Sequence, residues 1–472
     1  MSTVYQSDIV NDTNLATAVL ADRIGDLWKS SVDQARLSDG DKIIRLRLTI
    51  PEVDPLLWLD MQKDASRVYW AARDSEFETA GVGVADYING DFANKQGAVF
   101  SHIRGMIPAD MPDLRYFGGF RFSGGETLCD DNPWCAFGES RFVLPRFELC
   151  RRSHETNLVC NLVTEKDLDC LSDILTELEA ITFLQSFHQD HAPKPCCRRD
   201  LPGQDRWRDM ATFVLRKIDR GELAKVALAR ETTFEFSKVP RPFHLLHKLR
   251  TLTSECFHFG FQFGNETAFL GASPERLYRR NGRRIKTEAL AATRPRGKTV
   301  AEDIRLEQEL LETNKELTEQ QYVADSIANT LGRFCRWWHS DNKNDSARVL
   351  KLASVQHLIT RFEGELAGAV GDSEILDLLH PTPAVAGQPI PKAVDVIGQL
   401  EPFDRGWYAG PVGWVGKDAA EFAVAIRSGL LDDKQLRLYS GAGIVKGSRA
   451  DEEWDEIESK LGDFIASLEQ HD

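Results

Sequence analysis

The sequence predicts a fold of the α/β class, in its α+β form, with largely antiparallel sheets. Two observations support this prediction. Residues 275–290, "ERLYRRNGRRIKTEAL", read as a β-hairpin around an Asn281-Gly282 turn. Elsewhere, strand-like and helix-like segments follow one another without the regular alternation that is typical of a parallel sheet. The chain has 472 residues, of which 42% are hydrophobic, so it is long and apolar enough to bury a large core.

The first part of the chain contains both kinds of element. Residues 42–50 and 141–152 have the pattern of strands, and residues 172–187 have that of a helix. Residues 188–205 are rich in proline, cysteine and charge, which is typical of a connection. We therefore expect an N-terminal portion at 1–200 and a second region, with the chemistry-bearing residues, at 201–472.

In the second region, residues 225–236 are expected to form a strand or a strand pair, and residues 421–431 and 435–445 are expected to form one strand each. A long helix is predicted at 299–338, where Thr299 is the N-cap residue.

That helix is expected to break near Lys315. Residues 339–349 would then form a surface loop, and Ser448 would cap a last helix with Asp451 as the capping-box acid.

Composition excludes several classes of function. The formal net charge of −15 argues against a general nucleic-acid-binding protein, whose contact surface is basic. The chain has neither GxGxxG after a strand nor GxxxxGK[ST], which argues against dinucleotide binding and against P-loop nucleotide binding. No stretch approaches 18 unbroken apolar residues, so no membrane span is expected.

The cysteines favour a reducing compartment. There are nine, scattered and without a CxxC pair, which argues against a zinc ribbon or a secreted disulfide framework. The first 20 residues lack the basic and apolar regions of a signal peptide. We therefore expect reduced thiols in a cytoplasmic protein.

Lys225 is a candidate general base. On a strand, Lys225 shares one face with Ala227 and Ala229, which leave room beside it and little water around it. Desolvation lowers the pKa of a lysine and makes the neutral amine available. The alternative is an edge-strand lysine whose amine lies in solvent.

Glu275 is a candidate general acid. If Asn281-Gly282 forms the two-residue turn, counting outward places Glu275 opposite Glu288. Opposed carboxylates raise the pKa of one of the two, which suits an acid that works near neutral pH. In the alternative, arginines in 276–284 neutralise both glutamates.

Acidic side chains recur at helical spacing in two places. Glu312, Glu316 and Glu319 form one stripe, and Glu453 and Glu456 form another with Lys460 one turn further on. Most such stripes are solvated. Two carboxylates from different helices can nevertheless bind Mg²⁺, and Glu319 with Glu456 is one such pair.

Two further residues have an open interpretation. Arg427 ends an apolar strand, where its guanidinium could bind a carboxylate or form an ordinary ion pair. His357 lies in a strand-like run, where a lone histidine is more often a hydrogen-bonded core residue than a ligand.

Taken together, these segments resemble chorismate-utilising enzymes. The family segments occur in order between residues 205 and 467: "KVALAR", "GASPERLY", "EALAATRPRG", "HLITRFEGEL", "LLHPTPAVAGQP", "GWYAGPVGW", "FAVAIRSG" and "SGAGIVKGSRADEEWDEIESK". "YFGGFRF" at 116–122 is similar to a further family segment.

This resemblance implies a Mg²⁺-dependent enzyme that acts on chorismate. It implies a fold of two large, mainly antiparallel sheets packed face to face with helices outside. Lys225 would activate a water, Glu275 would protonate the departing hydroxyl, and Glu319 and Glu456 would hold the metal. The implied substrate-binding residues are Ala291, Thr293, His357, Tyr408, Arg427, Gly441, Gly443 and Lys460.

The isochorismate synthase branch is the most similar one. Ala291 stands where the aminodeoxychorismate type has a nucleophilic lysine, and no glutaminase domain or partner is expected. Salicylate synthase, which adds pyruvate elimination, and anthranilate synthase component I remain alternatives, as does a non-catalytic member that only binds chorismate. Three residues depart from the usual pattern: Ala292 replaces a glycine, Ala229 a serine and Gln320 a histidine.

Overall fold

The structure is a computed structural model, and it describes the whole chain except several short segments. The residues left out are 1–3, 6–9, 11, 36–42, 91–95, 124–131, 154, 168, 184–192, 265–266, 342–347, 369 and 470–472.

The larger of two sheets has 13 strands, all antiparallel to their neighbours except the first pair, which is parallel. In spatial order its strands are β1 (Val4–Tyr5), β2 (Ile43–Ile50), β9 (Glu155–Val163), β8 (Phe147–Arg152), β4 (Glu78–Val82), β3 (Ser66–Ala71), β12 (Phe257–Phe263), β13 (Thr267–Ser273), β22 (Ser428–Asp432), β23 (Gln435–Val445), β11 (Lys225–Phe236) and β10 (Pro195–Leu201), with β19 (Gly387–Gln388) also paired to β11.

The second sheet has ten strands and is antiparallel throughout. Its order is β16 (Cys335–Ser340), β18 (Val355–Leu366), β15 (Arg284–Pro295), β14 (Arg276–Asn281), β21 (Ala419–Val424), β20 (Pro411–Val415), β6 (Tyr116–Phe120), β7 (Ser140–Leu144) and β5 (Asp86–Gly90), with β17 (Arg348–Lys351) paired to β18.

Both sheets combine strands from the two ends of the chain. In the larger sheet β3 pairs with β12, and in the smaller sheet β6 pairs with β20. The apolar faces of both sheets contribute to one continuous hydrophobic core. Within it the ring of Phe422 from β21 lies 6.2 Å from that of Phe120 in β6. The predicted fold class, with two large antiparallel sheets and helices, is confirmed.

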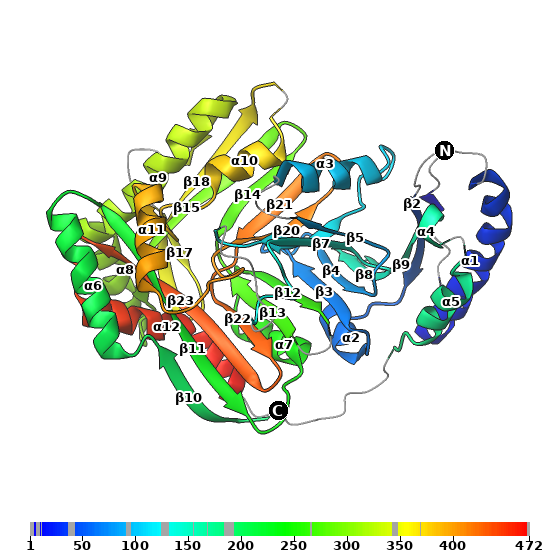
Figure 1. The fold of residues 1–472 in the computed structure, drawn as a ribbon, viewed down its shortest axis with the longest axis horizontal. Helices are drawn as coiled ribbons and strands as arrows, with labels where there is room; N and C mark the ends of the chain where they lie inside the picture. The colour runs from blue at the N-terminus through cyan, green and yellow to red at the C-terminus, as the bar shows by residue number, and fades with distance from the viewer. Residues whose placement is uncertain are drawn as a thin grey trace.

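The helices lie outside the sheets (Figure 1). They are α1 (Thr13–Ala35), α2 (Pro55–Met61), α3 (Gln96–Met106), α4 (Thr164–Asp167), α5 (Leu171–Glu179), α6 (Gln204–Asp219), α7 (Pro242–Leu252), α8 (Val300–Glu312), α9 (Asn314–Phe334), α10 (Asp372–Leu379), α11 (Ile390–Leu400) and α12 (Ala450–Glu469).

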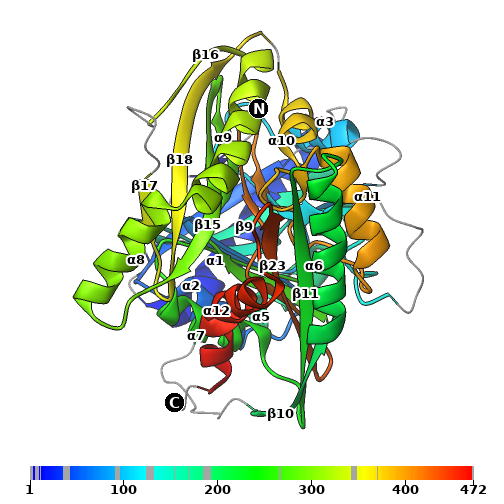
Figure 2. The ribbon, with the colours of Figure 1, turned by 90° about the vertical axis from the view of Figure 1, so that its left-hand side faces the viewer.

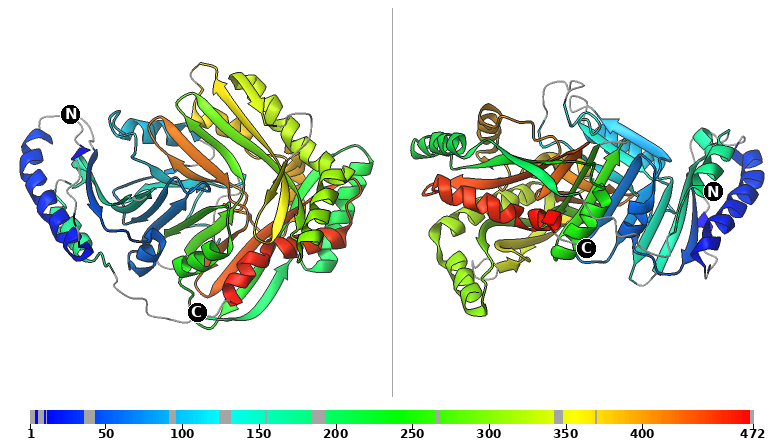
Figure 3. Two further views of the ribbon diagram at one scale, coloured as in Figure 1. Left: turned by 180° about the vertical axis from the view of Figure 1, so that it is seen from behind. Right: turned by 90° about the horizontal axis from the view of Figure 1, so that it is seen from below.

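Helices from distant parts of the chain gather at one end of the molecule. α6, α8, α9 and α12 lie there, whereas α1 and α5 pack together at the other end (Figure 3). α9 packs against β15 and β18 (Figure 2) because its apolar residues recur every three or four positions, at Val323, Ile327, Leu331 and Phe334. No helix within the described ranges is both long and apolar enough to cross a membrane.

The predicted register of the central hairpin is wrong. Asn281 pairs with Arg284. This register differs by two residues from the one in which Glu275 would face Glu288, so the two glutamates are not opposite each other. The loop is Gly282-Arg283, one residue later than expected, and its first residue, Gly282, has φ +56°, a left-handed conformation that glycine adopts without strain.

Several element boundaries also differ from prediction. The long helix does break, at Thr313, but it ends at Phe334, and the expected helical residues Trp337 and Trp338 belong to β16. Thr299 caps α8 as predicted, since its side chain accepts the Glu302 amide.

The predicted cap of the last helix is not observed. The hydroxyl of Ser448 accepts the amide of Val445, and α12 begins only at Ala450. The expected strand 421–431 is two strands, β21 and β22, which belong to different sheets.

Two expected loops contain strand residues. Residues 195–201, expected in a connection, form the edge strand β10, whereas 188–192 lie outside the described residues. The expected loop 339–349 begins in β16 and ends in β17, and its residues 342–347 are not described. The expected helix at 172–187 ends at Glu179, and its last residues, 184–187, are also not described.

Candidate active site

The site forms where the chain crosses between the two sheets. It leaves β13 at Ser273 and enters β14 at Arg276, and it returns from β21 at Val424 to β22. The two crossings are bonded to each other: the Val424 amide donates to the Glu275 carbonyl at 3.1 Å, and the Ser273 hydroxyl donates to the Val424 carbonyl at 2.6 Å. This pairing brings Glu275 and Arg427, one from each crossing, to the same place.

A cavity of about 70 Å³ lies beside these crossings. Ten of the predicted site residues line it: Glu275, Ala291, Thr293, Glu319, His357, Tyr408, Arg427, Gly441, Gly443 and Lys460. Lys225 and Glu456 are not in its lining, but each forms an ion pair with a residue that is.

Lys225 is fully buried at the start of β11. It pairs with Val445 on one side and with Gln388 on the other, so the alternative of an edge-strand lysine is wrong. Its Nζ lies 2.9 Å from Oε1 of Glu319, yet it has no hydrogen-bond partner of good geometry among the described residues. An unsatisfied buried amine is rare outside functional sites.

A glycine separates Lys225 from the cavity. A Cβ atom at Gly443 would lie 2.3 Å from Oε1 of Glu319 and 2.8 Å from Cε of Lys225. Any side chain at Gly443 would therefore displace the ion pair. This explains in physical terms why a glycine is needed at this position of β23.

Glu275 is an acid held in its neutral form. Its side chain is buried, and Oε1 has no hydrogen-bond partner among the described residues. Burial and, to a smaller extent, the charge of Glu288 raise the pKa of Glu275 to about 8, against the attraction of Lys225 and Lys460. The pKa of Glu275 is therefore raised, as expected from the sequence, but the main cause is burial, and Glu288, which does not face Glu275, contributes less.

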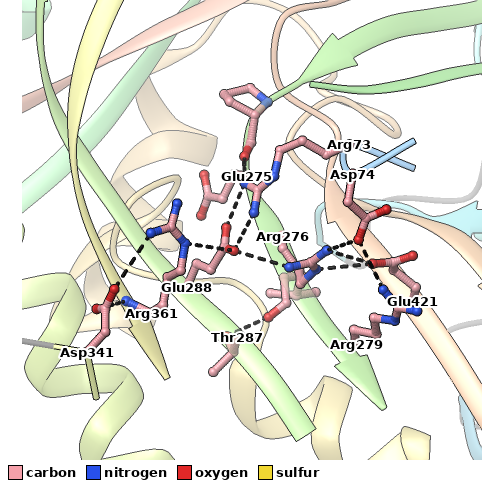
Figure 4. A network of polar contacts seen from close by, with 12 residues as sticks. Arg73, Asp74, Glu275, Arg276, Arg279, Thr287, Glu288, Asp341, Arg361 and Glu421 are labelled. Carbon is pink, nitrogen blue, oxygen red and sulfur yellow. Dashed lines mark hydrogen bonds and ion pairs between the residues drawn. The ribbon is translucent and has the colours of Figure 1, made fainter. Parts of the chain in front are cut away.

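An arginine from the N-terminal portion supports the acid. Nη1 of Arg73, which follows β3, donates to the carbonyl of Pro274 at 2.7 Å and to Glu288 at 2.9 Å. Figure 4 shows Glu288 between Arg73 and Arg276. Arg73 thus holds the crossing that carries Glu275. No local signal in the sequence indicates this role, because the contact spans 201 residues.

His357 orients Arg427. The guanidinium of Arg427 donates to Nε2 of His357, so this nitrogen must carry the lone pair, since arginine has no acceptor. Nδ1 then carries the proton and donates to the carbonyl of Ala292 at 3.2 Å. The hydroxyl oxygen of Thr293, 3.1 Å from Nδ1, is a second acceptor. Burial and the charges of Arg427 and Lys460 lower the pKa of His357, which keeps the ring neutral.

A β-bulge shapes this wall. The register of β15 against β18 shifts between Ala291 and Thr293, and Ala292 between them has φ +55°. This left-handed conformation favours glycine, which explains why a glycine is usual where this chain has Ala292.

The opposite wall carries Tyr408 and Lys460. The Tyr408 hydroxyl lies close to Gly441, where a Cβ would approach it to 3.1 Å, and burial raises the pKa of Tyr408. Nζ of Lys460 donates to the Gly441 carbonyl at 2.9 Å and lies 2.7 Å from Oε1 of Glu456.

Three carboxylates gather near one lysine. Burial lowers the pKa of Lys315, but the charges of Glu453, Glu456 and Glu319 outweigh it and raise the pKa overall. Glu453 is buried, not a solvated residue, and lies 2.6 Å from Lys315. Burial and the charge of Glu456 raise the pKa of Glu453 to about 7, despite Lys315.

The donor set fits Mg²⁺. In the described part of the chain no group of three or more His, Cys, Asp or Glu side chains forms a ready metal site. Mg²⁺ needs only one or two protein carboxylates when substrate oxygens and waters complete its shell. Glu319 and Glu456 are two carboxylates of this kind, each paired with a lysine.

The predicted stripe of Glu312, Glu316 and Glu319 is broken. Glu312 ends α8, whereas the other two lie on α9. Glu316 is buried and bonded to Arg294 at 2.7 Å, away from the cavity lining.

A second pair of residues, which no sequence motif indicated, supports Lys225. Arg405 and Glu401 form a buried ion pair at 2.6 Å. Arg405 also donates to the Ala227 carbonyl at 2.8 Å, and Glu401 accepts the Ala229 amide at 2.7 Å. The pair therefore holds β11, the strand of Lys225, in place.

Comparisons with known proteins agree with this geometry. The family model of chorismate binding enzymes matches residues 30–469. Isochorismate synthase MenF of Haemophilus influenzae is 30% identical over 95% of this chain and 96% of its own length. MenF of Bacillus subtilis is 34% identical over 75% of this chain and 74% of its own length.

Solved structures extend the likeness to the fold. The structure of MenF, the menaquinone-specific isochorismate synthase from Escherichia coli, superposes with a TM-score of 0.78 at 28% identity, covering 94% of this chain and 99% of that one. Anthranilate synthase component I from Streptococcus pneumoniae, at 20% identity and a TM-score of 0.69, covering 87% of this chain and 97% of that one, shares the fold. The chain belongs to the chorismate-binding enzyme family.

Proposed function

We propose that this chain is an isochorismate synthase, an isomerase that converts chorismate reversibly to isochorismate with Mg²⁺. The observation that carries the proposal is that Glu275, a buried carboxyl with a pKa of about 8, lines the cavity close enough to the buried amine of Lys225 for the two charges to interact. The similarity to isochorismate synthases over most of the chain supports the same reaction.

The reaction exchanges the position of one hydroxyl on the ring. In its neutral form, Lys225 accepts a proton from a water whose oxygen forms a bond to one ring carbon. Glu275 donates its proton to the hydroxyl that leaves another carbon, and this group departs as water. One water enters and one leaves, so substrate and product are isomers. Exchange of one proton with solvent restores both residues.

The substrate is a dicarboxylate, which requires cations in the cavity. Arg427 and Lys460 supply two, and the neutral ring of His357 keeps the Arg427 guanidinium oriented without adding charge. Thr293, Tyr408 and the backbone of Gly441 and Gly443 offer polar contacts at the walls, and Ala291 leaves room for the ring.

Glu319 and Glu456 would hold Mg²⁺, which supplies a positive charge that anchors a substrate carboxylate. Glu319 is also the ion-pair partner of Lys225, so the same carboxylate links the base to the metal site. Each of the two carboxylates lies against a lysine, Glu319 against Lys225 and Glu456 against Lys460.

We also propose a cytoplasmic location. All eight described cysteines are free, as expected in a reducing compartment, and Cys129 lies outside the described residues.

The test is product analysis. Purified protein is incubated with chorismate, with and without Mg²⁺, and the products are separated by chromatography. The expected result is a Mg²⁺-dependent mixture of chorismate and isochorismate. Salicylate and pyruvate from chorismate alone would indicate a salicylate synthase, an ammonia requirement would indicate an anthranilate synthase, and no turnover would indicate a non-catalytic member.

A further inference from the structure

A second cavity, which shares no lining residue with the first, has an excess of positive charge. Its volume is about 140 Å³, room for several waters or a compact anion. It is lined by Arg45, Arg47, Phe77, Asp113, Arg115, Cys150, Arg152, Glu155 and Asn157. None of these residues lines the candidate active site.

Neighbouring strands and one loop build this cavity. Arg45 and Arg47 lie two residues apart on β2, so they point to the same face of the larger sheet. Arg152 ends β8, two strands along, while Asp113 and Arg115 lie between α3 and β6. Arginines from the sheet and from the loop therefore line the same cavity.

Two of the arginines share the Asp113 carboxylate, and a third bonds the backbone carbonyl of the same residue. Asp113 lies 2.8 Å from Arg152 and 3.4 Å from Arg47, and its backbone carbonyl accepts from Arg115 at 2.9 Å. Against a net charge of −15 for the whole chain, such a local excess of cations is unusual.

The remaining charges of the cavity do not remove this excess. Arg45 forms an ion pair with Glu148 at 2.7 Å, so the charges of these two residues cancel. Glu155 is exposed, and its carboxylate accepts from Asn157 at 2.7 Å.

Aromatic rings hold the cations in place. The guanidinium of Arg115 lies 4.4 Å from the ring centres of both Phe77 and Trp414, and that of Arg152 lies 5.3 Å from Phe77. The buried Nε of Arg115 has no hydrogen-bond partner among the described residues. Burial and the charge of Arg152 lower the pKa of Arg115 to about 10, against the attraction of Asp113, so its charge is incompletely compensated.

We propose that this cavity, built around Arg47, Arg115 and Arg152, binds a compact oxyanion of phosphate size, separately from the substrate site. An added anion would share the guanidinium groups that now compete for Asp113. Phosphate and carboxylate groups match the fork of an arginine guanidinium, which is the chemistry that this site offers.

The experiment is calorimetric titration of the full chain with inorganic phosphate at constant ionic strength, with chloride as the balancing anion. A parallel titration with malonate distinguishes a phosphate site from a carboxylate site: tighter binding of phosphate supports the proposal, and exclusive binding of malonate contradicts its choice of ligand. Saturable binding with one site beyond the substrate cavity is expected.

Variants locate the bound anion. Arg152 is exposed, and Arg152→Gln should weaken phosphate binding at least tenfold. Asp113→Asn removes the competing carboxylate and should strengthen binding severalfold, a gain that damage to the fold would not produce. Arg305→Gln, an exposed arginine paired with Glu309 on α8, is the matched control and should leave binding unchanged.

The substrate cavity is tested as the competing location. Arg427→Gln removes a cation there and should leave phosphate binding at the second cavity intact. Loss of all phosphate binding in Arg427→Gln, with normal binding in Arg152→Gln, would overturn the proposal. Equal affinity in Arg152→Gln, Asp113→Asn and the control would overturn it as well.

Discussion

At the scale of single residues, burial decides the chemistry of this site. Glu275 and Lys225 have ionisable side chains that are buried. Oε1 of Glu275 and Nζ of Lys225 have no hydrogen-bond partner among the described residues. Such groups cost stability unless a ligand or a proton compensates them. Glu275 is compensated by its proton, which is also what makes it an acid.

The raised pKa of Glu275 predicts how stability depends on pH. Because its pKa rises from about 4.5 in the unfolded chain to about 8 in the folded one, the folded state keeps a proton that the unfolded state loses. The free energy of unfolding should therefore fall between these values as pH rises, by about 1.4 kcal/mol per pH unit from this group alone. Urea denaturation of wild type and Glu275→Gln at pH 5 and 7.5 measures the difference.

In the Glu275→Gln variant this dependence should vanish, since an amide does not titrate. Its turnover should also be lost, and the wild-type rate of chorismate consumption should decline above about pH 8 as the acid loses its proton. Identical pH dependence of stability in the two proteins would mean that Glu275 is ionised in the folded state.

Lys225 should be dispensable for binding but not for turnover. Lys225→Met keeps the volume of the buried side chain and removes the amine, so chorismate consumption should fall by at least a thousandfold, within the range that a catalytic base contributes. Lys434→Met, an exposed lysine in the turn before β23, is the control. Near-normal turnover in Lys225→Met would exclude it as the base.

At the scale of elements, irregularities shape the site more than regular strands do. Two crossings between sheets carry Glu275 and Arg427, and a bulge in β15 turns Thr293 toward His357. Arg427 and Ala292 both have positive φ, at +49° and +55°. Regular strands bring the elements together, and the breaks in them direct the side chains.

The bulge offers a test of strain. Ala292→Gly should stabilise the protein by about 1 kcal/mol, because glycine adopts the left-handed conformation without the steric cost that alanine has. Thermal or urea unfolding measures it. Ala289→Gly, on the same strand but in regular geometry, should instead destabilise, and a loss of stability in both variants would contradict the strain at Ala292.

A second element-level prediction concerns the crossing at Glu275. Arg73→Met removes the bonds to the Pro274 carbonyl and to Glu288. The crossing should loosen, so kcat should fall about tenfold or more while KM changes less, since Arg73 does not line the cavity. Arg73→Lys, which keeps the charge, should restore part of the rate. A change confined to KM would contradict a positioning role.

At the scale of the whole molecule, the chain folds as a shared structure rather than in two halves. Strands from before residue 200 extend both sheets through the β3–β12 and β6–β20 pairs. Removal of the N-terminal portion would expose two strand edges and the apolar faces beside them, which favours aggregation.

A fragment of residues 195–472 should therefore fail to fold on its own. The expected result is insoluble protein, or a soluble chain without a cooperative unfolding transition, and no turnover of chorismate. The full chain prepared in parallel is the control. A fragment that unfolds cooperatively and consumes chorismate would show that the second region is an independent domain.

Local sequence motifs were sufficient to predict the fold class, the family and most of the residues around the cavity. Ten of the predicted site residues line it, because each belongs to a short motif that can be read without knowing its neighbours in space. The strand of Lys225 and the cap at Thr299 follow in the same way from local patterns.

Only the tertiary structure decided the rest. The hairpin register, the support of Glu275 by Arg73, the Arg405–Glu401 pair and the buried state of Glu453 depend on contacts between residues far apart in the chain. The raised pKa of Glu275 also has burial as its main cause, and burial is a property of packed sheets. Local patterns name the side chains, whereas packing sets their surroundings and so their chemistry.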